Sequence, residues 1–135
     1  TAEGSFGIIW PSDKSKQVTF TGSPVSGQWF GGALLEERKA PKGDGSYETL
    51  HITKYYEVKP WSEKDSYGNY FEFCKTGYRP YDILVMCAYL AVKYYDRRCI
   101  VSSDGERIEW KIAVGILSQV LSESEDTICM LLNRL

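Results

Sequence analysis

The sequence predicts an α+β domain, in which an antiparallel sheet of about five to six strands from the N-terminal half packs against two main helices and a short C-terminal helix. Residues 6–75 follow the short apolar period of strands, whereas residues 79–135 follow helical spacing. No repeat or Pro/Ser-rich linker divides the 135 residues. We therefore expect a single domain that spans residues 1–135.

A long hairpin is the main expected feature of the N-terminal half. Residues 28–39 form its outgoing strand, 40–46 form a turn with one Pro and two Gly, and 47–58 form its returning strand. Shorter apolar runs, bounded by turn residues, predict further strands at 6–10, 17–21, 70–75 and 99–102.

Period-2 alternation assigns the faces of these strands. On the returning strand it puts Leu50 and Ile52 on the core side, followed by Tyr56 and Val58, and His51 on the opposite side. In 70–75, Phe71 and Phe73 are expected to face the core, and Tyr70 and Glu72 to face outward.

Residues 81–95 predict a central helix. Every position is apolar or aromatic except Asp82 and Lys93, and such a helix is surrounded by protein rather than lying on a surface. Pro80 and Asp82 mark its start. Its 15 residues fall short of the roughly 20 that a membrane span needs, so no membrane association is expected.

The remainder of the chain predicts two further helices. Ser103 and Glu106 have the spacing of a capping box that opens the second one. Gly115, which lies on the apolar face of this helix, suggests a close approach to a neighbouring element. The carboxylates at 123–126 favour the start of a short C-terminal helix, for which a closing strand is the alternative. The apolar face of the second helix comprises Trp110, Ala113, Val114, Leu117, Val120 and Leu121.

Charge and cysteine content narrow the possible functions. The net charge is -2, and acidic and basic residues are balanced in both halves, which argues against binding to duplex DNA or membranes. No signal peptide opens the chain. The cysteines have no metal-ligand spacing, so we expect reduced thiols, a cytoplasmic location, and neither metal nor other cofactor. They are Cys74, Cys87, Cys99 and Cys129.

Enzyme motifs are missing from the sequence, and no catalytic residue is assigned. There is no GxSxG, Walker-type, HExxH or GxGxxG pattern. His51, the single histidine, could pair with Glu36 or Glu37 across the hairpin and act as a general base. An exposed sheet histidine without a catalytic role is the simpler interpretation.

Aromatic residues are the strongest functional signal. They make up 14% of the chain, and many lie between residues 55 and 81 among lysines. Single-stranded nucleic-acid binders use this combination, because bases stack on rings while cations contact phosphates. Acidic residues in the same stretch cancel much of the charge, and core packing also selects aromatic residues. The outward candidates are Lys54, Tyr55, Tyr70 and Lys75.

A second candidate site is the strand-to-helix junction at 74–82. Lys75, Tyr78, Arg79 and Asp82 lie beside backbone N–H groups that could bind a phosphate or carboxylate. The turn at 102–105 could complete a shared anion pocket. A solvated connection without a ligand is the alternative.

These observations favour a small non-enzymatic binding module. It is expected to form a homodimer, or to bind a protein or other macromolecule, through an aromatic sheet face; a dimer would also cover the central helix. One alternative is single-stranded nucleic-acid binding. Another is an enzyme with an irregular site built from His51 and carboxylates.

Overall fold

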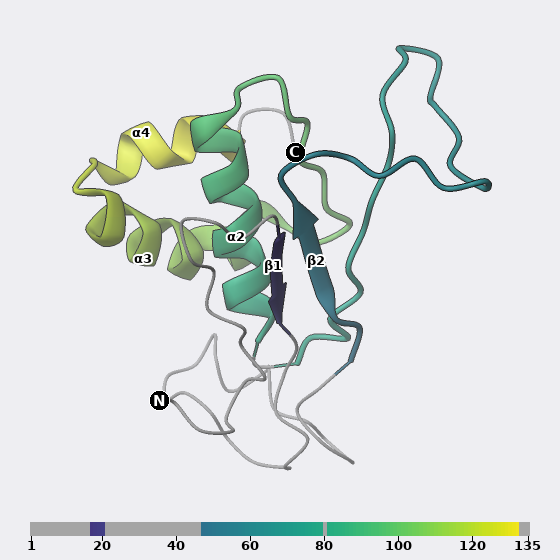
Figure 1. Ribbon diagram of the computed structural model, residues 1–135. Coiled ribbons are helices and arrows are strands. Elements are labelled where there is room, and N and C mark those ends of the chain that lie inside the picture. Colours follow the sequence, from purple (N-terminus) through teal and green to yellow (C-terminus); the bar gives the residue numbers. More distant parts are fainter. Residues whose placement is uncertain (1–16, 21–46, 80, 133–135) are drawn as a thin grey trace.

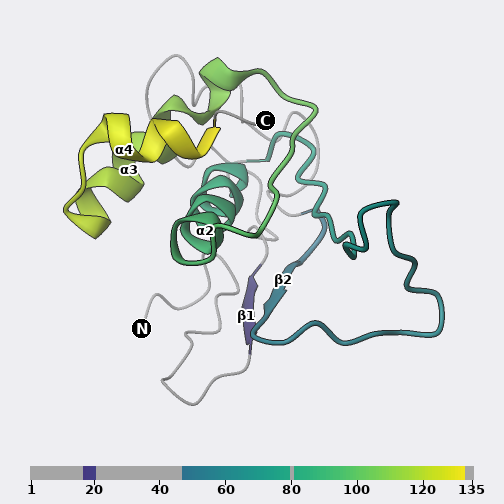
Figure 2. The same ribbon diagram turned by 90° about the horizontal axis from the view of Figure 1, so that it is seen from above.

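The structure, a computed structural model, describes residues 17–20, 47–79 and 81–132. Helices and strands are both present, as the sequence predicts. Figures 1 and 2 show helix α2 between the strands on one side and the later helices on the other. The elements are β1 (Gln17–Phe20), β2 (Leu50–Thr53), α2 (Asp82–Tyr95), the 3₁₀ helix η1 (Arg107–Trp110), α3 (Lys111–Leu121), α4 (Glu125–Cys129) and the 3₁₀ helix η2 (Met130–Leu132).

Within the described residues the sheet has two antiparallel strands, rather than the five to six that we expected. The register pairs Phe20 with Leu50 and Thr19 with His51. Strand β2 therefore pairs with β1. The predicted strands 6–10 and 28–39 lie outside the described residues.

Two predicted strands are not strands in the structure. Residues 70–75 form an irregular segment, joined to the chain before it by an isolated bridge between Lys64 and Tyr70. Residues 99–102 are also irregular, although the side chain of Val101 is buried. Both runs have strand-like composition, but β propensity forms a strand only where a neighbouring backbone completes the hydrogen-bond ladder.

The face assignments hold only within β2. Leu50 is buried and Ile52 is half-buried, whereas His51 is exposed on the other face. Beyond Thr53 the pairing ends. Tyr56 and Val58, which alternation put on the core side, are exposed. The inward orientation expected for Phe71 and Phe73 is also wrong, because these side chains are 69% and 59% exposed.

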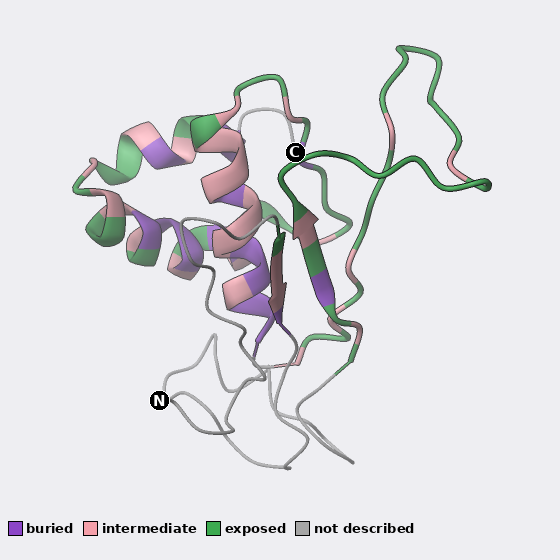
Figure 3. Cartoon of the chain, in the orientation of Figure 1, coloured by how far each residue is buried: buried purple, intermediate pink, exposed green. Residues whose placement is uncertain are grey.

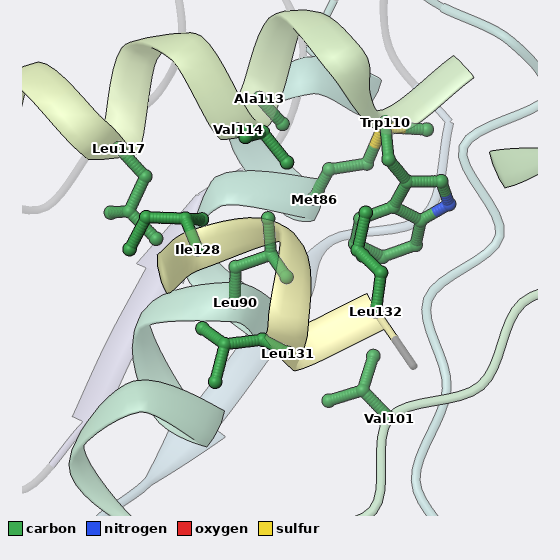
Figure 4. Packing of buried hydrophobic residues seen from close by; sticks show 10 residues of the cluster. All are labelled: Met86, Leu90, Val101, Trp110, Ala113, Val114, Leu117, Ile128, Leu131 and Leu132. Atoms are coloured by element: carbon green, nitrogen blue, oxygen red, sulfur yellow. The ribbon is translucent and has the colours of Figure 1, made fainter. Parts of the chain in front are cut away.

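Helix α2 confirms the prediction of a central helix. One cluster of buried residues joins its Met86 and Leu90 to the later helices, as Figure 4 shows. A second cluster joins its Val85, together with Tyr81, to the β1–β2 sheet. The apolar residues on opposite sides of this helix thus pack against two different parts of the protein. The first cluster comprises Met86, Leu90, Val101, Trp110, Ala113, Val114, Leu117, Ile128, Leu131 and Leu132.

The predicted capping box is displaced by three residues. The box comprises Glu106 and Glu109 and opens η1, which continues directly into α3. Ser103 instead accepts a hydrogen bond from the backbone N–H of Gly105 (3.0 Å). The close approach expected at Gly115 is not present either. A Cβ there would lie 3.6 Å from the carboxylate of Glu125, an ordinary van der Waals distance.

The C-terminal segment is helical, as its acidic residues indicated. Ser124 caps α4 by accepting a hydrogen bond from the N–H of Thr127 (3.1 Å). Ile128 and Leu131 are buried in the first cluster. The alternative of a closing strand is therefore wrong for the described residues.

Candidate functional site

The most exposed aromatic surface is a long excursion of the chain between β2 and α2. We call residues 54–75 the aromatic arm. In Figures 1 and 2 it extends away from the helices, and Figure 3 shows it almost entirely exposed. Tyr67 is 88% exposed and Trp61 is 76% exposed. The other large apolar side chains that the arm exposes are Tyr55, Tyr56, Val58, Phe71 and Phe73.

Contacts between residues 56 and 70 hold the arm in its shape. The rings of Tyr56 and Tyr70 stack, with centroids 4.3 Å apart and planes 10° from parallel. The Tyr56 hydroxyl lies 3.0 Å from the Ser62 hydroxyl. The carboxylate of Asp65 accepts hydrogen bonds from the backbone N–H groups of Tyr67 (2.9 Å) and Asn69 (2.8 Å). These bonds, that from Asn69 above all, lower the pKa of Asp65.

Hydrogen bonds also fix the base of the arm to the domain. The Tyr81 hydroxyl donates to the backbone carbonyl of Glu48 (2.6 Å), and the backbone N–H of Lys75 donates to the Glu48 carboxylate (2.7 Å). The Cys74 thiol donates to the same Glu48 carbonyl (3.6 Å). Burial, followed by the negative charge of Glu48, raises the pKa of Cys74 to about 11.

Four lysines of the arm lie over aromatic rings. The ammonium groups of Lys54, Lys59, Lys64 and Lys75 lie 5.1–5.9 Å from the ring centroids, within the range of cation–π attraction. The rings are those of Tyr55, Trp61, Tyr70 and Phe73 respectively. The arm also carries Glu57, Glu63, Asp65 and Glu72, so its formal net charge is zero.

A groove of about 1020 Å³ runs beside the base of the arm. Residues 69–78 and the turn at 102–105 line it, together with α2 residues that include Tyr89. We call it the acidic groove, because Lys75 is the one cation among its described lining residues. Five carboxylates line it: Asp65, Glu72, Asp82, Asp104 and Glu109.

Trp110 lines the acidic groove and carries an unsatisfied donor. The residue is 3% exposed, and its buried indole nitrogen has no hydrogen-bond partner among the residues that the structure describes. Figure 4 shows this nitrogen pointing away from the apolar cluster that holds the rest of the ring. An unpaired buried donor costs roughly 1–3 kcal/mol, a cost that the packing of the Trp110 ring in the apolar cluster offsets.

The structure brings only some of the predicted site residues together. Lys54 and Tyr55 pair on the exposed arm. Tyr70, expected to face outward, is half-buried in its stack with Tyr56. Lys75 and Tyr78 line the acidic groove.

Arg79 and Asp82 do not form the anion site that the sequence predicted for this junction. Within the described part of the chain the buried Nε of Arg79 has no hydrogen-bond partner, and the Asp82 carboxylate accepts a hydrogen bond from the Thr76 hydroxyl (2.7 Å). The backbone N–H of Arg79 donates a hydrogen bond to the carbonyl of Thr76 and is not available to an anion. The junction and the turn at 102–105 do line one groove, as a shared pocket would require, but the carboxylates there disfavour an anion.

Several exposed residues of the arm were not among the predicted site residues. Trp61, Lys64 and Tyr67 lie in the segment 61–69, whose Ser, Gly and Asn content is that of a polar loop, and Lys59 lies just before it. The available signal was the presence of large aromatic residues in such a polar loop, where core packing gives no reason for them.

The other candidate chemistry has little support in the geometry. Nδ1 of His51 lies 3.1 Å from the hydroxyl of Thr19, its cross-strand neighbour. Glu36 and Glu37, its expected partners, lie outside the described residues. Among the residues that the structure describes, no group of three or more potential ligands could hold a metal ion. All four cysteines are free thiols.

Comparisons with models of protein families, with curated proteins and with solved structures found no match for this chain. In the described ranges, no helix has both the length and the apolar character that crossing a bilayer requires. A functional assignment therefore depends on the surfaces described above.

Proposed function

We propose that this chain is a single-domain, non-enzymatic interaction module that self-associates through its aromatic arm. One observation carries the proposal: large aromatic side chains are concentrated and exposed on an arm whose own contacts hold it in shape. Aromatic residues are enriched at protein interfaces, and an ordered surface loses less conformational entropy on binding.

The charge pattern of the arm favours a second copy as the partner. Four lysines and four carboxylates leave the arm neutral, so it presents both signs to whatever it meets. In a two-fold symmetric dimer the same patch lies on both subunits and must complement itself. A surface with equal numbers of both charges has no net charge repulsion to overcome when two copies meet. The free thiols suit the reducing cytoplasm, where we place the protein.

Sedimentation velocity over a range of protein concentrations tests the proposal. The wild-type chain should associate, and Trp61→Ala or Tyr67→Ser should weaken the dissociation constant by about 10-fold or more, as interface aromatics do. Tyr95→Ser is the matched control, because Tyr95 is 76% exposed but lies at the end of α2. It should associate like the wild type. A monomeric wild-type chain would overturn the proposal.

Single-stranded nucleic-acid binding is the second candidate function. The observation that favours it is the series of lysines beside exposed rings, which offers stacking surfaces next to cations. Binding of an oligonucleotide should quench the emission of Trp61 and weaken steeply with added salt. Unchanged emission at micromolar protein, with Trp61→Phe as the control for assignment, would exclude this function.

A further inference from the structure

We propose that the acidic groove of one copy binds the segment Lys59–Pro60–Trp61 of a second copy's arm. This inference rests on the proposed self-association and specifies its geometry. In a symmetric pair each arm enters the other subunit's groove, so that one two-fold axis relates two identical contacts.

Charge is the first support. The described lining of the groove carries five carboxylates and one lysine. Glu72 and Asp104, which both line the groove, are exposed. The arm segment 54–64 carries three lysines and two glutamates, so its charge has the opposite sign. Complementary potentials of this kind select the partner and its orientation.

The shape and composition of the two surfaces agree with the charge. Lys59 holds its ammonium group 5.9 Å from the centre of the Trp61 ring, so cation and ring form one compact unit. The groove combines carboxylates with the rings of Tyr70, Phe73 and Tyr78, which suit such a unit.

The arm segment cannot be explained as the lining of its own groove. No residue of 54–64 lines it, and Figures 1 and 2 show the arm extending away from the body. Trp110 lines the groove with its indole N–H buried and without an acceptor among the described residues, so this group can report on a segment that docks beside it.

Charge exchange between copies tests the inference. Lys59→Glu reverses the charge of the arm segment, and the double variant Glu72→Lys, Asp104→Lys removes the formal negative charge of the groove, since its described lining then has three carboxylates and three lysines. All three side chains are exposed, so both proteins should fold. Each variant alone should associate about 10-fold or more weakly in sedimentation velocity. An equimolar mixture should regain wild-type affinity to within about 3-fold, because the unchanged arm meets an unchanged acidic groove and the reversed arm meets a groove that has gained two lysines.

A second readout uses the Trp110 indole as a reporter in the lining of the groove. In ¹H–¹⁵N spectra its N–H resonance should shift as the wild-type chain associates, because a docked arm segment changes its surroundings. It should not move in Lys59→Glu at the same concentrations. This measurement separates arm docking from a general loss of stability.

Two different results would overturn the inference. If the wild type associates and Trp61→Ala weakens it, but the groove variant associates normally or the mixture does not recover, then self-association stands and docking in the groove is wrong. A wild-type chain that stays monomeric would overturn both the inference and the function on which it rests.

Discussion

At the scale of single residues, Tyr81 does the most to join the arm to the domain. Its ring is fully buried against the sheet, and its hydroxyl donates to the carbonyls of Glu48 (2.6 Å) and Lys75 (3.3 Å). One side chain thus links β2, the base of the arm and the start of α2. Tyrosine suits this position because it combines a large apolar ring with one polar tip.

Tyr81→Phe should therefore destabilise the protein by about 0.5–1.5 kcal/mol, because the ring still fits while the Glu48 carbonyl keeps only the weaker thiol donor of Cys74. Urea denaturation would measure the loss. Tyr95→Phe, at an exposed position, should change the free energy of unfolding by less than about 0.5 kcal/mol. Equal effects of the two substitutions would contradict the role assigned to the Tyr81 hydroxyl.

At the scale of elements, α2 is the support for both surfaces. Its N-terminal part packs against the sheet, and its middle packs against α3, α4 and η2. Tyr89 packs against both clusters and also lines the acidic groove. Of the five carboxylates of the groove, α2 itself carries Asp82, in its first turn.

Leu90→Ala tests this central position. Leu90 is fully buried, so the truncation should cost about 2–5 kcal/mol through lost burial and the cavity left behind. Val120→Ala, at a position 71% exposed in α3, should cost less than about 0.5 kcal/mol. Chemical denaturation of both variants gives the comparison. A loss below about 1 kcal/mol for Leu90→Ala would contradict the central placement of α2.

At the scale of the whole molecule, folding buries several thiols and phenols in protonated form. Burial raises the pKa of Cys87 to about 11, from the usual thiol value of 9.0, and that of Tyr89 to about 12, from 10.0. Cys74 is raised to about 11. Between pH 9 and 11 the unfolded chain has lost thiol protons that the folded chain keeps, so unfolding releases protons there.

Stability should therefore be insensitive to these thiols below about pH 8.5 and fall as the pH rises through 9 to 11. Cys87→Ala removes one of these groups and should lose less stability over this range than the wild type does. Val92→Ala, a packing change in the same helix, should keep the wild-type slope. Urea midpoints at pH 7 to 10.5 provide the measurement; identical slopes for wild type and Cys87→Ala would contradict the prediction.

The helices could be predicted because their determinants are local. The all-apolar run of α2, the helical spacing of Trp110 and Leu117, and the acidic start of α4 each lie within one short segment. A helix satisfies its backbone hydrogen bonds within itself, so the local pattern is enough to indicate it. The displaced capping box shows that the boundaries are less certain, because Glu106 and Glu109 have the same spacing as Ser103 and Glu106.

The sequence predicted the candidate site only in part, because the side-chain orientations in it depend on strand pairing. The aromatic and lysine content of residues 54–75 indicated a binding surface, but alternation assigned Phe71 and Phe73 to the core and Tyr70 to the surface. The structure has the reverse, since the two phenylalanines are exposed and Tyr70 stacks on Tyr56. Alternation identifies a face only where a strand is paired, and the arm leaves the sheet after Thr53.

By itself, the sequence determined that helices follow strands, that α2 occupies the centre, and that aromatic residues and lysines share one segment. Only the tertiary structure decided which strands pair, that this segment leaves the body as an arm, and that distant carboxylates line one groove beside Trp110. The physical reason is the range of the interactions. Helices form from contacts three or four residues apart, whereas strand pairing and grooves depend on residues that meet only when the whole chain has folded.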